Sequence, residues 1–282
     1  MLDPSVHLSL RQLRTLRSCA LAAAALGHGT RAFAQAPPVT LLELSASPSV
    51  VERADRAYWA GDAAESLRLI EGWLENAPGD VDARWRAARA SVALGIIANG
   101  AALEARWFRN GIAHSDKALR LDSTHVEVQR WAVASKGKLA VGTGAIETAT
   151  LVQEIWDLSH QLLERDPDDA LAHHVLGTLH YEIMKLSAFK RFLARTFVGN
   201  EALSRASWED AVYHHALAVS LAPGAVAFRV GFAETLKRRG RVPEAIEQLR
   251  SAMSLPVVHP GDPDYTSLAH RYLNELLADG NG

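Results

Sequence analysis

AVAFRVGFAETLKRRGRVPEAIEQLRSAMSLP, residues 225–256, is the stretch of sequence that decides the fold. Its apolar residues recur at intervals of three and four, which is typical of two amphipathic helices. Gly240 predicts the turn between them, and Pro243 predicts the first turn of the second helix, where proline is tolerated. Gly231 stands where the two helices have to approach closely, opposite a stripe of small, large and small side chains: Ala245, Leu249 and Ala252. The stretch therefore predicts a helical hairpin.

Earlier parts of the chain repeat this pattern. Two units close with a residue spacing of four, three and five: Ser66, Ile70, Trp73, Pro78 and Ala211, His215, Ala218, Pro223. With Ser123 counted as a degenerate closing position, the closing residues are 78, 123, 167, 223 and 256, at intervals of 45, 44, 56 and 33. The tetratricopeptide repeat has a period of about 34 residues. The extra residues fall around 95–108, 136–150 and 185–206, where they predict lengthened helices or short added ones at one edge.

No stretch after Ser49 alternates apolar and polar residues as a strand does. The sequence therefore predicts an all-α fold, a tetratricopeptide-like right-handed helical solenoid with lengthened or inserted helices, over residues 49–282. Four to five helix pairs are expected, because a single pair cannot bury its apolar stripe without neighbours.

The order of these long-insert units resembles the regulator of microtubule dynamics family and its bacterial relatives. The similarity covers about residues 50–278 and is carried by the segments 111–140 (GIAHSDKALRLDSTHVEVQRWAVASKGKLA), 162–199, 205–224 and 236–263. In animals this family implies helical repeat proteins associated with microtubules and with mitochondrial or endoplasmic-reticulum membranes. For this chain the resemblance implies the fold and an adaptor character. The microtubule role is not carried over, because the N-terminus described next predicts a periplasmic protein, which would not contact microtubules.

The N-terminus has the order of a secretory signal peptide. Arg11, Arg14 and Arg17 precede a short apolar stretch at 18–26, and Ala32-Phe33-Ala34 supplies small residues for cleavage near Ala34. Residues 1–34 are therefore expected to be a signal peptide and residues 35–48 a linker, with the mature protein periplasmic or secreted. The mature chain would carry 26 basic and 31 acidic side chains and no cysteine.

The composition narrows the function classes. The chain has 282 residues, of which 48% are hydrophobic, with 30 basic and 32 acidic side chains and one cysteine. No excess of positive charge is present to bind nucleic acid, and a single cysteine excludes a disulfide framework. We expect a protein or peptide partner, no nucleic acid and no cofactor; the sequence leaves the oligomeric state open.

Histidines are the strongest chemical signal. His173, His174 and His180 share one expected helix, and His214 and His215 lie on its partner helix. The hypothesis of a metal-dependent hydrolase would use His173, His174, His214 and His215 as ligands, although no compact ligand motif is present. The alternative is that His173, His180 and His215 pack at repeat positions, with His174 and His214 half exposed.

The segment 185–197 (KLSAFKRFLARTF) is a second candidate site. An apolar stripe at helical spacing is flanked by four basic side chains, Lys185, Lys190, Arg191 and Arg195. A basic amphipathic helix can contact an anionic membrane surface or an acidic partner, or it can pack at the edge of the array with a solvated basic side.

The leading hypothesis is a non-catalytic adaptor or scaffold, exported, that binds a protein or peptide in a concave groove lined by the first helices. The side chains expected on that groove are Arg84, Arg89, Arg130, His174 and Tyr181. The alternatives are the metal-dependent hydrolase and a microtubule-associated regulator, as in the animal family.

Overall fold

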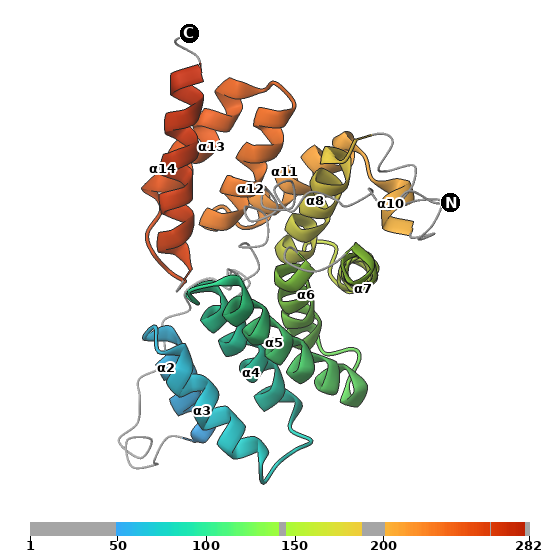
Figure 1. Cartoon of the computed structure of the whole chain (residues 1–282), viewed down its shortest axis with the longest axis vertical. Coiled ribbons are helices and arrows are strands. Elements are labelled where there is room, and N and C mark those ends of the chain that lie inside the picture. The colour runs from blue at the N-terminus through green and yellow to red at the C-terminus, as the bar shows by residue number, and fades with distance from the viewer. Residues whose placement is uncertain (1–48, 141–144, 188–200, 260, 280–282) are drawn as a thin grey trace, which may run out of the picture.

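The computed structural model describes residues 49–140, 145–187, 201–259 and 261–279. In these ranges the chain forms helices and no strand. Successive helices pair antiparallel, and the pairs stack along the chain (Figure 1). The pairs are α2 (Val50–Trp59) with α3 (Ala63–Leu74), α4 (Val81–Ile96) with α5 (Ala101–Leu121), α6 (Val126–Ala140) with α7 (Ala145–Arg165), α8 (Ala170–Lys185) with α11 (Trp208–Leu221), and α12 (Val226–Arg238) with α13 (Val242–Ser254). The all-α solenoid predicted from the sequence is confirmed.

The extra residues between closing positions lengthen helices, as predicted. Helices α5 and α7 are each 21 residues long, against 13 for α13 in the unit of plain length. The largest insertion, between α8 and α11, contains the short helix α10 (Glu201–Arg205). A last helix, α14 (Asp262–Asp279), follows the fifth pair and covers α12 and α13. None of the described helices is both long and apolar enough to cross a membrane.

Four of the five repeat boundaries, those at residues 78, 123, 167 and 223, are built in the same way. The side chain six residues after the closing position donates a hydrogen bond to that position's backbone carbonyl, which the end of the preceding helix leaves without a helical partner. The four bonds are Arg84 Nε to Pro78 O (2.9 Å), Gln129 Nε2 to Ser123 O (2.9 Å), His173 Nε2 to Pro167 O (2.8 Å) and Arg229 Nε to Pro223 O (3.0 Å). Ser123 therefore occupies the place that proline takes in the other three units.

Side chains at the N-cap positions begin many of the helices. Asp62, Asp80, Asp169 and Ser207 each accept a hydrogen bond from the backbone N–H three residues on, at 2.8–3.0 Å. Ser49 and Glu52 form a reciprocal capping box at the start of α2. These bonds satisfy N–H groups that have no acceptor inside the helix.

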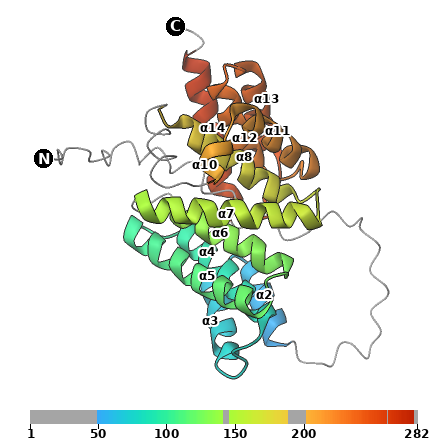
Figure 2. The ribbon, with the colours of Figure 1, turned by 90° about the vertical axis from the view of Figure 1, so that its right-hand side faces the viewer.

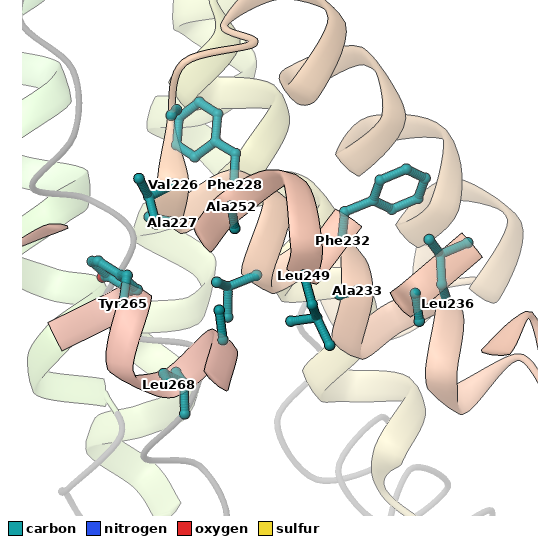
Figure 3. Packing of buried hydrophobic residues seen from close by; sticks show 14 of the residues in the cluster. Val226, Ala227, Phe228, Phe232, Ala233, Leu236, Leu249, Ala252, Tyr265 and Leu268 are labelled. Carbon is teal, nitrogen blue, oxygen red and sulfur yellow. The ribbon is translucent and has the colours of Figure 1, made fainter. Parts of the chain in front are cut away.

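The first helices of the inner pairs are buried on nearly all sides. In α4, α6, α8 and α12 the sides that face neither the partner helix nor the next unit are also covered, so hardly any of their residues are exposed. The C-terminal core illustrates the packing: Phe228, Phe232 and Leu236 of α12 pack with Leu249 of α13 and Leu268 of α14 (Figure 3). Helix α7 lies across the molecule, with α2–α6 on one side and α8–α14 on the other (Figure 2).

The first and last units touch each other. The ring of Trp59, at the end of α2, lies 5.6 Å from the ring of His259, in the loop before α14. Asp262, at the start of α14, is close enough to Tyr58 to help raise the pKa of its hydroxyl, which burial raises to about 12. The lower end of α14 lies above α2 in Figure 1. The array is therefore curved tightly enough for its ends to meet.

Candidate functional site

Two of the arginines predicted to line a groove hold the first units together instead. Arg84 is 8% exposed and donates to the carbonyl of Pro78. Arg89 is 5% exposed; its guanidinium lies 3.9 Å from the ring centre of Tyr58 and pairs with Asp55. Burial lowers the pKa of Arg89, and Asp55 opposes that shift. Arg84 thus ties α4 to the loop before it and Arg89 joins α4 to α2; neither side chain faces an open surface.

Arg130 joins the third unit to the fourth. Its Nε and Nη2 atoms donate to Asp169 Oδ2 at 2.9 and 2.7 Å, and its Nη1 atom donates to Glu127 at 2.7 Å. The other oxygen of Asp169 caps α8 through the backbone N–H of Ala172. The Arg130 side chain is 18% exposed, while that of Asp169 is fully buried. One carboxylate thus fixes both the helix start and the interface between units.

The remaining predicted site residues divide into two groups. Tyr181 is buried and packs edge-on against Trp208. Lys185, at the end of α8, pairs with Glu182 at 2.9 Å and lies 4.7 Å from the ring centre of Tyr181. The other three basic residues of the insert lie outside the described residues: Lys190, Arg191 and Arg195.

The open groove expected along the first helices is therefore wrong for Arg84, Arg89, His174 and Tyr181, all of which are buried. The reason is that other parts of the array cover them: the Pro78 loop covers Arg84, α2 covers Arg89, α12 covers His174 and α11 covers Tyr181. Sequence spacing within one helix does not encode these contacts.

The structure does bring the five histidines together, as their positions on paired helices predicted. We call His173, His174, His180, His214 and His215 the histidine cluster. His173 Nε2 has to carry a proton, because it bonds to the Pro167 carbonyl oxygen. Its Nδ1 lies 2.8 Å from His214 Nδ1, so a neutral His173 accepts there and His214 donates. His180 Nδ1 accepts a hydrogen bond from the backbone N–H of Ser207 at 3.1 Å.

His174 and His215 form the innermost part of the cluster. His174 stacks on Phe228 with ring centres 4.4 Å apart and meets His215 edge-on at 5.2 Å. Neither nitrogen of His174, nor Nδ1 of His215, has a hydrogen-bond partner in the described structure. His174 is 2% exposed, so the expectation that it is half exposed is wrong. Helix α12 covers it with Phe228, a contact that the sequence of α8 alone does not reveal.

Two glycines make room for these rings. A Cβ atom on Gly177 would lie 2.8 Å from His215 Cδ2, and one on Gly231 would lie 2.9 Å from His174 Cε1. Contacts that short do not occur between real side chains, so both positions exclude any residue larger than glycine unless the rings shift. The close approach predicted at Gly231 is confirmed, and the histidine rings are what approaches.

Burial favours the neutral state of four histidines of the cluster, His174, His180, His214 and His215. Burial lowers the pKa of His215 to about 3 and that of His214 to about 4, and neighbouring imidazoles add to both shifts. Burial also lowers the pKa of His174 well below its ordinary value, and that of His180 to a smaller extent. Desolvation disfavours a charged imidazolium wherever no acid compensates it.

The described histidine cluster does not offer the set of ligands that the metal-dependent hydrolase hypothesis requires. Across the described ranges no group of three or more histidine, cysteine, aspartate or glutamate side chains is placed to hold a metal ion. His173 uses both nitrogens in protein contacts, and His174 and His215 meet as packed rings with Phe228 and Phe232. The geometry is that of packing, in agreement with the alternative proposed for His173, His180 and His215.

Sequence reasoning missed two sets of structural residues. One is the series of donors six residues after each closing position, a signal that was present as a polar side chain at that place in four units. The other is Lys136, which is 5% exposed and pairs with Asp116 of α5 at 2.9 Å and Glu154 of α7 at 2.6 Å. Its partners lie 18 or more residues away, so no local pattern indicates them.

Comparison with known proteins agrees with this architecture. A family model described as "Regulator of microtubule dynamics protein 1-3" matches residues 50–277. Regulator of microtubule dynamics protein 3 of Bos taurus is 27% identical over 185 residues, 64% of this chain and 38% of that protein. Regulator of microtubule dynamics protein 1 of Bos taurus is 22% identical over 171 residues, 59% of this chain and 52% of that protein. The alignment thus spans about half or less of each relative.

Among solved structures, TTC0263, a thermophilic TPR protein of Thermus thermophilus, superposes with a TM-score of 0.56. The superposition covers 79% of this chain and 97% of that chain, at 16% sequence identity. At so low an identity the likeness concerns the fold alone.

Proposed function

The chain belongs to the regulator of microtubule dynamics protein 1-3 family, and on this premise we propose that it is a non-catalytic adaptor that binds a protein or peptide partner. The observation that carries the proposal is the fold, a stack of helix pairs of the tetratricopeptide type. Such arrays offer long preformed surfaces, so that partner binding requires little ordering of the adaptor.

Burial inside the array restricts where a partner can dock. The inner helices use their arginine, histidine and tyrosine side chains to hold neighbouring units, and breaking those contacts to bind a partner would be unfavourable. Among the described helices, the more exposed second helices remain for docking. We assign the contact to the basic insert, whose residues Lys190, Arg191 and Arg195 follow an ion-paired Lys185.

Charge reversal tests this assignment. The partner is first identified by proximity labelling in the envelope of the source organism, using the tagged full-length protein. A variant with Lys190→Glu, Arg191→Glu and Arg195→Glu is then expected to bind that partner at least tenfold more weakly. The matched control reverses Arg106, Lys117 and Arg120, three exposed basic residues of α5, and is expected to bind normally. Equal binding by the two variants would remove the insert from the proposal.

The same insert can be tested against membranes. Vesicles containing anionic lipid, compared with neutral vesicles, measure whether the full chain binds a charged surface. Binding that requires anionic lipid and is lost on reversal of the insert charges would assign the insert to a membrane surface instead of a protein. An adaptor bound only to its protein partner leaves both vesicle types unbound.

We further propose that the protein is exported and cleaved near Ala34, on the strength of the arginines, apolar stretch and small residues of its N-terminus. Mass spectrometry of the protein from the envelope fraction should find a chain beginning at about Gln35. Replacement of Ala32 and Ala34 by Asp should block cleavage. Uncleaved protein in the cytosol would contradict export.

A second candidate is microtubule association, which the names of the bovine relatives favour. It requires a cytosolic protein with an uncleaved N-terminus. Co-sedimentation of the full chain with microtubules, together with N-terminal sequencing, separates it from the exported adaptor. Processing near Ala34 with no co-sedimentation dismisses this candidate.

A further inference from the structure

We propose that the packing of α8 against α11 is proton-sensitive: this crossing holds the C-terminal units in place at neutral pH and opens on mild acidification. The device would act on the shape of the array and is independent of which partner it binds. It rests on the geometry of the histidine cluster, which joins α8, α11 and α12.

His173 and His214 form the outer pair of the cluster, and only one proton fits between their Nδ1 atoms. His173 Nδ1 and His214 Nδ1 are 2.8 Å apart, and the bond of His173 Nε2 to Pro167 O fixes the His173 tautomer. If both rings became imidazolium ions, both Nδ1 atoms would carry a proton and point it at the other. The contact would then break. Full protonation of the pair is therefore incompatible with the closed crossing.

The inner pair cannot accept a charge where it lies. His174 and His215 are 2% and 1% exposed, both nitrogens of His174 and Nδ1 of His215 have no hydrogen-bond partner among the described residues, and the two rings pack against Phe228, Phe232 and each other. A buried imidazolium with no acceptor for its N–H groups is strongly unfavourable. Both rings also lie directly against the helix backbone at Gly177 and Gly231, where an added Cβ atom would come within 2.8–2.9 Å of them.

The charges around the cluster do not compensate for protonation of the inner pair. Lys138 of α6 disfavours a charged His174, and His160 of α7 disfavours charged His180 and His214. Asp210 of α11 is the acid that favours the charged forms, and it acts on His180 and His214. Helix α12 faces the inner pair with Phe228 and Phe232. Burial and the neighbouring imidazoles disfavour a charge on both His174 and His215, and Lys138 adds to the effect on His174.

The sign of the pH effect follows from these placements. Burial lowers the pKa of His174 and His215 in the closed state, whereas in an open state both titrate near their ordinary value of 6.5. Above pH 6.5 both states are neutral and the crossing has its full stability. As the pH falls below 6.5 the open state binds protons and the closed state does not, so the closed crossing loses stability relative to the open state. Between pH 6.5 and 5.5 the opening constant rises about fivefold for each such histidine, hence about 30-fold for two.

The N-terminal units provide an internal reference. There His114, between α3 and α5, lies 3.4 Å from Glu71, an acid that favours its charged form and opposes the effect of burial on its pKa. The pKa of His114 is still lowered, but the opposing effect of Glu71 makes the acid response expected of these units smaller than that of the α8–α11 crossing, which carries two inner histidines.

Hydrogen exchange of the full chain tests the proposal. Protection factors, corrected for the intrinsic pH dependence of exchange, are measured by mass spectrometry at pH 7.5, 6.5 and 5.5. We expect those of α8 and α11 to fall at least about 30-fold between pH 6.5 and 5.5, and those of α2–α4 to change by less than about fivefold. The double variant His174→Phe, His215→Phe keeps aromatic rings but removes the inner titration, so its response should fall to about fivefold, the share left to His214. The control variant His270→Gln changes an exposed histidine of α14 and should behave as the wild type.

Three results would overturn the proposal. One is unchanged protection of α8 and α11 in the wild-type protein down to pH 5.5. Another is an equal loss of protection in every helix, which would indicate general acid unfolding. The third is a folded double variant with the full acid response. If the double variant does not fold, the comparison of α8 and α11 with α2–α4 in the wild type still decides between these outcomes.

Discussion

Gln129 donates a hydrogen bond from its side-chain Nε2 to the carbonyl oxygen of Ser123, 2.9 Å away and six residues earlier. The same relation joins arginine or histidine to proline in three other units. Ser123 bears no resemblance to proline, so a residue-by-residue comparison of the units would miss this boundary. The shared element of the repeat is the carbonyl and its donor, and the identity of the residue that supplies the carbonyl is secondary.

The stability lost on replacing Gln129 should therefore depend on whether the new side chain can donate a hydrogen bond. Gln129 is fully buried, and Gln129→Leu leaves the Ser123 carbonyl and the Arg165 Nη1 atom, 3.0 Å from Gln129 Oε1, without this partner. We expect a loss of about 2 kcal/mol in the free energy of unfolding. Gln129→His, which restores the donor used in the fourth unit, should lose about half as much. Urea unfolding of the two variants makes the comparison; equal losses would show that only volume matters at this position.

Asp169 is expected to be the most sensitive of the capping residues. Asp169→Ala removes the cap of α8 and leaves Arg130 with Glu127 as its remaining acidic contact. The expected loss is about 3 kcal/mol, against about 1 kcal/mol for Asp62→Ala, where the carboxylate caps α3 at an exposed site. The difference between the two variants in denaturant unfolding measures the Arg130 contact. A similar loss in both would mean that this contact contributes nothing.

Adding one methyl group at the histidine crossing should be destabilising. Gly231→Ala and Gly177→Ala place a Cβ atom within 2.9 Å of His174 and His215 respectively, and we expect each to lose about 1–3 kcal/mol of stability. Gly72→Ala in α3 is the matched control, because a Cβ atom there meets nothing within 4 Å. Alanine favours helix over glycine, so that variant should gain up to about 1 kcal/mol. Thermal unfolding that ranks the three variants differently would contradict the packing described.

The last helix should contribute through its buried face. Leu268 is 4% exposed in the core formed by α12, α13 and α14, whereas Leu277 is 41% exposed. Leu268→Ala is expected to lose about 3 kcal/mol and Leu277→Ala less than about 0.5 kcal/mol. Both can be read from guanidinium unfolding. A small loss at Leu268 would mean that α14 separates from the array before the rest unfolds.

Much of the fold was predictable because its signals are local. The three-and-four spacing of apolar residues, Gly240 and the proline positions predict helix pairs and turns at the places where the structure has them. The lengths between closing positions also predict the long α5 and α7. Each of these features depends on residues within about one repeat of each other.

The candidate site was less predictable because burial depends on units that are distant in sequence. The sequence alone predicts an exposed Arg89, but in the structure Tyr58 and Asp55 pack against it. It likewise predicts a half-exposed His174, which Phe228 covers. The grouping of the histidines was predictable, since the two helices that carry them form a pair. Their neutral, desolvated state was not, because it arises from the closure of the next unit over that pair.

The contact between Trp59 and His259 restricts how this protein can evolve. An open stack can gain or lose units by duplication or deletion, since each unit touches only its neighbours. Here an additional unit would carry His259 away from Trp59, and a missing unit would bring the two ends into collision. We therefore expect homologues that keep this contact to vary in the length of their loops and helices while keeping the same number of units.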